Sequence, residues 1–227
     1  MQKLLLIRGY NTDIAIGDDH YLYLKQHLSQ KYKVTYFNYA VTDDIQMVYK
    51  QLCVLIKKKK WDVLIGHSLG GALLTKYIRN NDVSAHKRVI LLMPFIGTRT
   101  IHTLASLIPP LQSLRLPKAL LVPSVFLYEG ACILTDSWDS IPISQVYDMY
   151  ADTQVSSNDF SFINDASNIF MFYASQELLN TIDEVYLAKI SPKKLNRVDG
   201  LHEVFYTPDT KNAKSFFSKL DKLLAEV

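Results

Sequence analysis

The sequence predicts an α/β protein with a mainly parallel β-sheet that is covered by helices on both faces. Short apolar runs alternate with amphipathic stretches along most of the chain, and this strand–helix repeat is typical of parallel sheets. At 227 residues, of which 48% are hydrophobic and 21% charged, the chain has the length and composition of one globular domain with a sizeable core.

The N-terminal part of the chain holds two strand–helix pairs. Residues 3–9 (KLLLIRG) form a short apolar run that ends in glycine, which predicts a buried strand. Residues 19–31 carry an apolar stripe at helical spacing, and residues 33–39 (KVTYFNY) are rich in the β-branched and aromatic residues of strands. A helix over about 43–58 begins at two aspartates and ends at Lys57–Lys60, charges that suit the two ends of a helix dipole. We therefore interpret the lysines as helix-end charges and not as a site for an anionic ligand.

The same alternation continues further along the chain, with one interruption that begins at residue 96. Strands are predicted at 61–67, 88–95, 168–174 and 194–200. Helices are predicted directly after Ser68, near 178–190 and over about 211–226. The chain is thus expected to form a core of residues 1–95 and 168–227 with an insertion over 96–167.

The stretch WDVLIGHSLGGALL, residues 61–74, places Ser68 in a G-x-S-x-G motif between a predicted strand and a predicted helix. Three of the 8 glycines in the chain, Gly66, Gly70 and Gly71, surround this serine. A serine nucleophile at a sharp strand-to-helix turn needs neighbours without side chains, and this context favours a nucleophile over an ordinary turn. We therefore predict that Ser68 is a catalytic nucleophile.

A serine hydroxyl needs a base to accept its proton, and histidine is suited to that role. Of the 6 histidines, only His202 follows the last predicted strand, at the carboxyl edge of the sheet where Ser68 is also expected. An acid that orients the histidine is expected between them in the chain, which favours Glu177 in the loop after the preceding strand. Asp183 and Asp199 remain alternatives.

Backbone N–H groups that stabilise the oxyanion complete such a site. The N–H of Leu69 follows the nucleophile directly, and the N–H of Tyr10 lies in the loop after the first strand, RGYNTD. Gly9 would keep the backbone of that loop close to the serine. Leu69 and Tyr10 are therefore the predicted oxyanion donors.

Together these motifs resemble the α/β-hydrolase superfamily, and within it the serine hydrolases of the lipase and esterase kind. GHSLGG matches the nucleophile elbow of the family, YASQE corresponds to the turn that carries its acid, and GLHEVF corresponds to its catalytic-histidine loop. The resemblance covers roughly residues 3–95 and 168–226, in the family's order. It implies a catalytic triad of Ser68, Glu177 and His202 and an oxyanion pair of Tyr10 and Leu69.

Three features depart from the family pattern. Arg8 stands where the family usually has a histidine before the glycine. The acid is a glutamate in place of the commoner aspartate, and Ala174 replaces the usual glycine of that turn. The sheet also begins at what resembles the family's third strand, so a trimmed fold of about six parallel strands is expected.

The insertion over 96–167 lies where the family carries a cap over the active site. Its segment LIPPLQSLRLPKALLVPSVFLYEG is apolar and punctuated by prolines. An apolar cap favours an acyl group held in a dry pocket, with simple packing of the cap onto the core as the alternative.

Composition and charge exclude several other classes of protein. A net charge of +3 is too small to indicate nucleic acid or a membrane surface as a partner. Cys53 and Cys132 have no disulfide or metal-ligand spacing, and no segment approaches the ~18 apolar residues of a membrane span. The apolar run near the N-terminus is also too short for a secretion signal. We expect a cytoplasmic protein that uses no metal and no cofactor and that has a small acyl compound as its partner.

The sequence thus predicts a serine hydrolase that cleaves a carboxylic ester or thioester of a small, mainly apolar acyl substrate through an acyl-enzyme. Two alternatives remain open. One is a hydrolase fold whose catalysis has decayed and which now binds a ligand or partner. The other is an α/β hydrolase that carries out a non-hydrolytic reaction such as acyl transfer.

Overall fold

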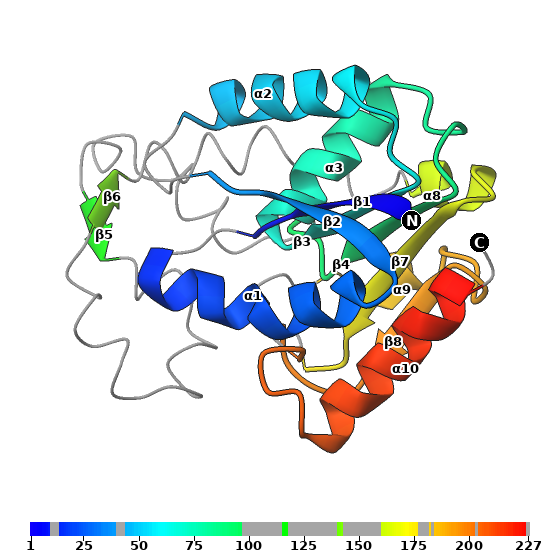
Figure 1. The fold of residues 1–227 in the computed structure, drawn as a ribbon. Helices are drawn as coiled ribbons and strands as arrows, with labels where there is room; N and C mark the ends of the chain where they lie inside the picture. The colour runs from blue at the N-terminus through cyan, green and yellow to red at the C-terminus, as the bar shows by residue number, and fades with distance from the viewer. Residues whose placement is uncertain are drawn as a thin grey trace.

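Six parallel strands form the central sheet of the protein. A computed structural model describes residues 1–9, 14–39, 44–96, 115–117, 140–142, 160–176, 182, 184–202 and 204–225. The strands are β1 (Gln2–Ile7), β2 (Tyr32–Phe37), β3 (Val63–His67), β4 (Arg88–Leu92), β7 (Ile169–Ala174) and β8 (Leu195–Val198). They lie in the order β2-β1-β3-β4-β7-β8, and every neighbouring pair is parallel (Figure 1). The predicted six-stranded parallel sheet is therefore confirmed.

Helices cover both faces of this sheet (Figure 1). One face carries α2 (Ile45–Lys58), α3 (Leu69–Asn80), α8 (Ser161–Asp165) and α9 (Glu184–Leu187). The other face carries α1 (Ile14–Ser29) and α10 (Lys211–Ala225). Among the described residues, no helix combines the length and the apolar character that crossing a membrane requires.

Neighbouring residues of β1 explain why the strands form unbroken apolar runs in the sequence. Leu5 and Ile7 pack in the core beneath α2 and α3, whereas Leu4 and Leu6 pack in the core beneath α1 and α10. All four side chains are fully buried, and burial of such a side chain contributes about 1.5–3 kcal/mol. A parallel sheet with helices on both faces needs apolar residues at successive positions for this reason.

Four of the predicted strands extend beyond the observed strands at the carboxyl edge. The strand predicted over 3–9 ends at Ile7, and the strand predicted over 88–95 ends at Leu92. Met93 is fully buried although it lies outside the sheet, with a φ of 40°. Its N–H still donates to the carbonyl oxygen of Phe172 in β7 at 2.9 Å, so burial extends the apolar pattern past the residue where the backbone leaves the extended conformation.

Two predicted helices differ from the observed ones in extent. The helix predicted over 19–31 begins earlier, at Ile14. The helix predicted near 178–190 is represented by the short α9, and Ile182 before it is not helical. The prediction of α2 is correct at its start, because the Asp44 carboxylate caps the helix by accepting hydrogen bonds from its first N–H groups.

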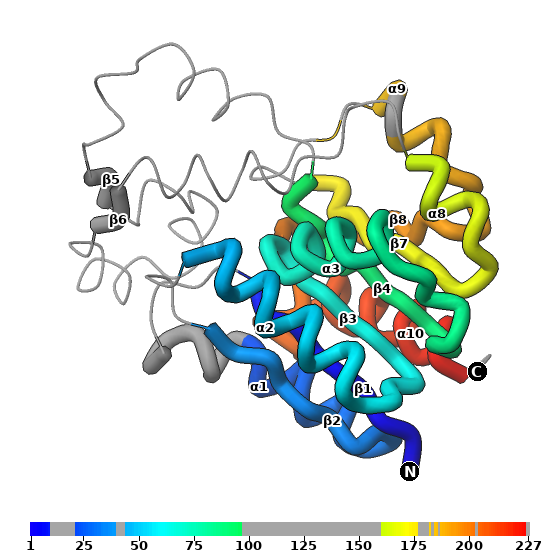
Figure 2. Tube along the Cα trace, turned by 90° about the horizontal axis from the view of Figure 1, so that it is seen from above, coloured from blue at the N-terminus to red at the C-terminus, as the bar shows by residue number. Residues whose placement is uncertain are grey.

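The insertion contains a small antiparallel pair of strands, β5 (Arg115–Pro117) and β6 (Ser140–Pro142). The ribbon view places this pair beyond the carboxyl edge of the large sheet (Figure 1). The view from above shows α2 and α3 lying over that sheet (Figure 2). Helix α8, near the end of the insertion, packs into the core through Phe160 and Ile163. The division into a core and a cap over 96–167 stays a prediction, because most of the insertion lies outside the described residues.

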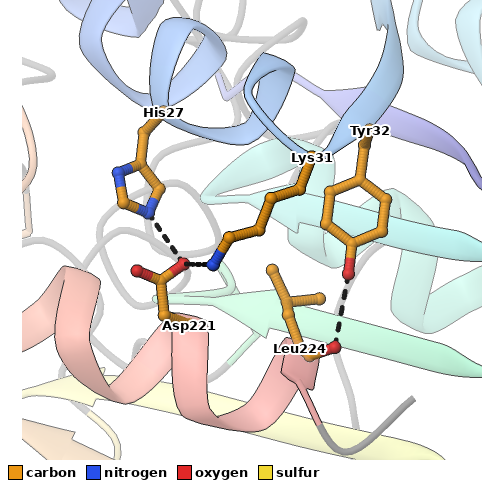
Figure 3. Close-up of polar contacts among 5 residues, drawn as sticks. All are labelled: His27, Lys31, Tyr32, Asp221 and Leu224. Atoms are coloured by element: carbon orange, nitrogen blue, oxygen red, sulfur yellow. Dashed lines mark hydrogen bonds and ion pairs between the residues drawn. The ribbon is translucent and has the colours of Figure 1, made fainter. Parts of the chain in front are cut away.

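Polar contacts join α1 to α10 on their shared face (Figure 3). Nε2 of His27 lies 2.9 Å from the Asp221 carboxylate, and Nζ of Lys31 lies 3.4 Å from the same oxygen. At the end of the helices the Tyr32 hydroxyl donates to the carbonyl oxygen of Leu224 at 3.3 Å. The first and last helices of the chain are thus attached to each other away from the carboxyl edge.

Candidate active site

Ser68 occupies the turn between β3 and α3 in a conformation that is rare for a residue with a side chain. Its φ is 51° and its ψ is −119°. Strain of this kind costs about 1–3 kcal/mol and persists where the surrounding structure enforces it, most often at functional sites. The turn that was predicted for a nucleophile elbow is therefore present at Ser68.

Glycines bring a strand, a helix and a loop together around this turn. A Cβ on Gly66 would lie 2.6 Å from the carbonyl oxygen of Gly70, and a Cβ on Gly70 would lie 2.2 Å from that of Arg8. A Cβ on Gly9 would lie 2.8 Å from the Cβ of Ser68. Because Cβ atoms do not approach other atoms so closely, only glycine allows the loop after β1 to lie directly against the serine.

Hydrogen bonds tie the backbone of Ser68 to the end of β4. Its N–H donates to the carbonyl oxygen of Leu92 at 3.0 Å, and its carbonyl oxygen accepts from the N–H of Phe95 at 2.9 Å. The N–H of Ser68 is therefore not available to an oxyanion. Leu69 begins α3, and because the first N–H groups of a helix have no acceptor within it, the N–H of Leu69 is suited to that role.

The loop after β8 brings His202 to the elbow. The His202 ring is buried, and its centre lies 4.8 Å from the ring centre of His67, the residue before Ser68. The structure thus places His202 beside His67, the residue before the predicted nucleophile, and its role as the base stays a prediction. The histidines His27 and His86 lie elsewhere, on the α10 side of α1 and at the amino edge of the sheet.

The loop after β7 is joined to the histidine loop by backbone hydrogen bonds. The N–H of Ser175 donates to the carbonyl oxygen of Val198 at 2.8 Å, and the N–H of Gln176 donates to that of Gly200 at 2.9 Å. Glu177, the predicted acid, follows Gln176 in the sequence and lies outside the described residues. Its assignment remains a prediction.

The structure describes one of the two alternative acids, Asp199, but not the other. Asp183 lies outside the described residues. Asp199 is part of the histidine loop, but its side chain is exposed to solvent. Water stabilises this exposed carboxylate, so the environment of Asp199 gives no reason to prefer it over Glu177.

The structure describes the predicted oxyanion loop as far as Gly9, and Tyr10 lies outside the described residues. The N–H of Gly9 donates to the hydroxyl oxygen of Tyr21 in α1 at 2.6 Å. This N–H already has an acceptor and is therefore not available to an oxyanion. The candidate donor of the loop is then the N–H that follows, which leaves the prediction for Tyr10 in place.

No protein-family model and no curated protein sequence matches the chain. Solved structures match it over nearly its whole length. One is a soluble variant of monoglyceride lipase from Saccharomyces cerevisiae in complex with a substrate analogue (16% identity, TM-score 0.68, covering 99% of this chain and 86% of that one). Two others are an esterase from Exiguobacterium antarcticum (13%, 0.62, 99% and 92%) and an α/β hydrolase enzyme from a Medee basin deep-sea metagenome library (9%, 0.61, 100% and 90%). The chain has the α/β-hydrolase fold. At these identities the likeness concerns the fold alone.

Arg8 is one of the residues that depart from the family pattern, and the structure describes the contacts of its side chain. Its side chain is only 1% exposed, its Nη1 donates to Oδ1 of Asn38, and its guanidinium carbon lies 6.0 Å from the centre of the Tyr39 ring. The Tyr39 hydroxyl in turn donates to the carbonyl oxygen of Arg8 at 3.1 Å. Arg8 therefore contacts the end of β2 and connects the oxyanion loop to that strand.

Sequence reasoning missed one contact behind the elbow of this hydrolase fold. The Tyr21 hydroxyl oxygen lies 2.5 Å from Nδ1 of His67. Burial, together with the neighbouring His202, holds the pKa of His67 well below its usual range, and burial raises the pKa of Tyr21. Both side chains are therefore neutral. Tyr21 belongs to the apolar stripe of its helix, and its sequence position gives no sign that it meets a residue 46 positions away.

The described residues hold no metal-binding cluster, and a groove that they line lies away from the carboxyl edge of the sheet. In the part of the chain that the structure describes, no group of three or more His, Cys, Asp or Glu side chains is arranged to hold a metal ion. A groove of about 620 Å³ is lined in part by Arg88 and Ile169, the first residues of β4 and β7. It therefore lies at the amino edge of the sheet, opposite Ser68.

Proposed function

We propose that this protein is a serine hydrolase that cleaves carboxylic esters or thioesters of small, mainly apolar acyl compounds. The observation that carries the proposal is the strained turn at Ser68, with a φ of 51°, next to the buried His202 loop. An ordinary turn does not need a serine in a costly conformation. In an α/β-hydrolase fold, a G-x-S-x-G turn between a strand and a helix is where the nucleophile lies.

In the proposed reaction, Ser68 attacks the acyl carbon while His202 accepts its proton. His202 then donates this proton to the leaving alcohol or thiol, and the acyl group remains on the serine oxygen. Water then attacks the acyl carbon while His202 accepts its proton, and His202 returns this proton to the Ser68 oxygen as the acid leaves. Glu177 would accept the second ring N–H of His202, and the N–H groups of Leu69 and Tyr10 would stabilise the oxyanion.

The class of acyl group is inferred from the insertion and from the related folds. The predicted cap over 96–167 contains a long apolar segment, and a dry pocket favours an apolar acyl chain. Two of the similar structures are named as a lipase and an esterase. These points support an ester or thioester whose acyl part is small and mainly apolar.

The nucleophile is tested by labelling with a fluorophosphonate probe and mapping the modified peptide. Ser68 should be modified, and Ser68→Ala should abolish labelling and reduce ester turnover by about 10⁴-fold or more. Ser84→Ala is the matched control, because this exposed hydroxyl donates to the neighbouring Asp82 carboxylate at 2.9 Å. It should leave labelling and turnover unchanged. Stoichiometric labelling of another serine, with Ser68 untouched, would overturn the mechanism.

The substrate class is tested with nitrophenyl esters of increasing chain length and with a matching thioester. Turnover should depend on chain length if the cap lines an acyl pocket. A flat profile would overturn the apolar-pocket part of the proposal. Labelling of Ser68 without turnover of any ester or thioester would favour acyl transfer, the non-hydrolytic alternative.

A further inference from the structure

A chain of hydrogen bonds runs behind the elbow, from the loop after β1 to the loop after β8. The N–H of Gly9 donates to the Tyr21 hydroxyl oxygen at 2.6 Å, and this oxygen lies 2.5 Å from Nδ1 of His67. On the other side of the ring, Nε2 of His67 lies 3.4 Å from the carbonyl oxygen of His202. The oxyanion loop, the elbow and the histidine loop are thus connected through two side chains, Tyr21 and His67.

The direction of each hydrogen bond in this chain is determined. The carbonyl oxygen of His202 can only accept, so Nε2 of His67 carries a hydrogen and donates it. Burial keeps the pKa of His67 low, so the ring is neutral and its Nδ1 has no hydrogen. Nδ1 therefore accepts the hydrogen of the Tyr21 hydroxyl, while the Tyr21 oxygen accepts the N–H of Gly9. In this arrangement each of the three hydrogen bonds has one donor and one acceptor.

The two side chains are closed to both water and substrate. Tyr21 is 2% exposed and His67 is 1% exposed. The His67 ring also packs edge-on against Phe205, with ring centres 4.9 Å apart. A charge on His67 would repel the imidazolium that forms on His202 during the proposed reaction, because the two ring centres are 4.8 Å apart. Because His67 stays neutral, His202 can hold the proton from Ser68 without repulsion from a second charged ring.

We infer that Tyr21 and His67 are positioning residues, which hold the oxyanion loop and the His202 loop in fixed places relative to Ser68. This inference rests on the proposed hydrolase function. Tyr21 fixes Gly9, the residue before the second predicted oxyanion donor, and His67 fixes the backbone of His202. A displacement of about 1 Å in such groups can cost about 100-fold in rate.

The kinetic test compares Tyr21→Phe with Tyr32→Phe. Each variant removes one buried hydroxyl that bonds to a backbone group, but Tyr32 bonds to Leu224 near the C-terminal end of α10, away from the elbow (Figure 3). Tyr21→Phe should lower kcat by about 10- to 100-fold with little change in KM, and should slow fluorophosphonate labelling in parallel. Tyr32→Phe should change neither. Equal kcat values for the two variants would overturn the inference.

A double-variant cycle tests whether the two residues act as one unit. His67→Phe removes both hydrogen bonds of the ring and should slow turnover as Tyr21→Phe does. The combined variant Tyr21→Phe/His67→Phe should be no slower than the slower single variant, because either substitution alone already breaks the hydrogen-bond network. Rate losses that multiply would overturn the inference.

A third readout does not depend on activity. Nitrogen NMR of the wild-type histidines should show His67 with its hydrogen on Nε2, unchanged from about pH 5 to about pH 8. A hydrogen on Nδ1, or an ordinary titration of this ring, would overturn the inference even if Ser68 proves to be the nucleophile and even if Tyr21→Phe does not fold. Absence of Ser68 labelling in the wild-type protein would overturn the proposed function and this inference together.

Discussion

The backbone N–H of Gln176 donates to the carbonyl oxygen of Gly200 at 2.9 Å, which joins the loop after β7 to the loop that carries His202. The hydroxyl oxygen of Ser175 lies 3.4 Å from the N–H of the same glycine, so the two loops contact each other at several atoms. Glu177 is the next residue after Gln176. A fixed relation between these two loops is what an acid–histidine pair requires.

We predict from this relation that Glu177→Gln folds normally and lowers ester turnover by about 10³- to 10⁴-fold. The expected reason is that the His202 imidazole, without a carboxylate partner, can take the wrong tautomer. The matched controls are Asp183→Asn and Asp199→Asn, which should change turnover little. Circular dichroism and steady-state kinetics on the three variants decide the assignment. If Asp183→Asn or Asp199→Asn is crippled while Glu177→Gln stays active, the acid is a different residue.

The central fold could be predicted from the sequence because both faces of the sheet are buried. The side chains from Leu4 to Ile7 alternate between the cores on the two faces of the sheet, so the strand forms an unbroken apolar run in the sequence. The ends of the strands could not be predicted in this way. Met93 is as buried as its neighbours in β4, but its φ of 40° ends the strand. The apolar pattern of the sequence indicates burial and does not indicate where the backbone conformation changes.

A second prediction concerns the close contact between α3 and the end of β1. The added methyl group of Gly70→Ala would lie 2.2 Å from the carbonyl oxygen of Arg8 and 2.5 Å from that of Ile7. Both are backbone atoms, so the strand end must move, at an expected cost of about 1–3 kcal/mol or more. This loss should appear although alanine is the better helix former by about 1 kcal/mol.

The comparison variant for this test is Gly71→Ala. Its methyl group would meet the side chain of Pro94 at 2.9 Å, which is a milder contact. Urea denaturation should therefore rank Gly70→Ala as less stable than Gly71→Ala, and both as less stable than the wild type. A Gly70→Ala protein with wild-type stability would contradict the predicted contact between helix and oxyanion loop.

The sharp turn at Ser68 and the place of the His202 loop after β8 could be predicted because each depends on a local motif and on strand order. The role of Tyr21 could not be predicted. Its spacing in α1 is that of a core residue, and only folding brings its hydroxyl to His67 and to the N–H of Gly9. Contacts of this kind carry no local sequence signal, because they join residues that are distant in the chain.

A third prediction concerns stability at mildly acid pH. Burial, with His202 as a second cause, holds the pKa of His67 well below the ordinary value of 6.5. The unfolded chain therefore binds a proton at this residue before the folded protein does, so stability is complete above about pH 6.5 and falls as the pH decreases below it. The contribution of one such group has a slope of up to about 1.4 kcal/mol per pH unit.

Urea denaturation between about pH 7.5 and pH 5 measures this slope. Carboxylates with lowered pKa values, such as that of Glu184 beside Arg197, lose their stabilising effect only at lower pH and do not interfere. His67→Gln should be less stable at neutral pH but should depend less on pH over this window. The described titratable groups that face the ring are Tyr21, His202 and Tyr206, and none of them is changed in the variant. An unchanged slope in His67→Gln would show that His67 does not titrate as predicted.

The last prediction concerns Arg8, which replaces the histidine that the α/β-hydrolase family usually has. The guanidinium is buried, its Nε has no hydrogen-bond partner, and no carboxylate of a described residue forms an ion pair with it. Among the described residues, its side-chain acceptor is Oδ1 of Asn38, which is exposed to solvent. Burying a cation is costly unless a carboxylate pairs with it, and the described residues supply no such carboxylate, so the charge itself is not expected to stabilise the fold.

We therefore predict that Arg8→Met keeps the free energy of unfolding within about 1 kcal/mol of the wild type, or raises it. Methionine retains most of the length and apolar contact of the arginine stem, and the Asn38 oxygen can accept from water instead. Arg8→Ala is the size control and should lose about 2–5 kcal/mol, because it leaves a cavity in the same place. Ester turnover of Arg8→Met should also persist, since the guanidinium contacts Asn38 and Tyr39 at the end of β2 and not Ser68. A loss in Arg8→Met as large as that in Arg8→Ala would contradict this prediction, because it would mean that the charge holds the oxyanion loop against β2.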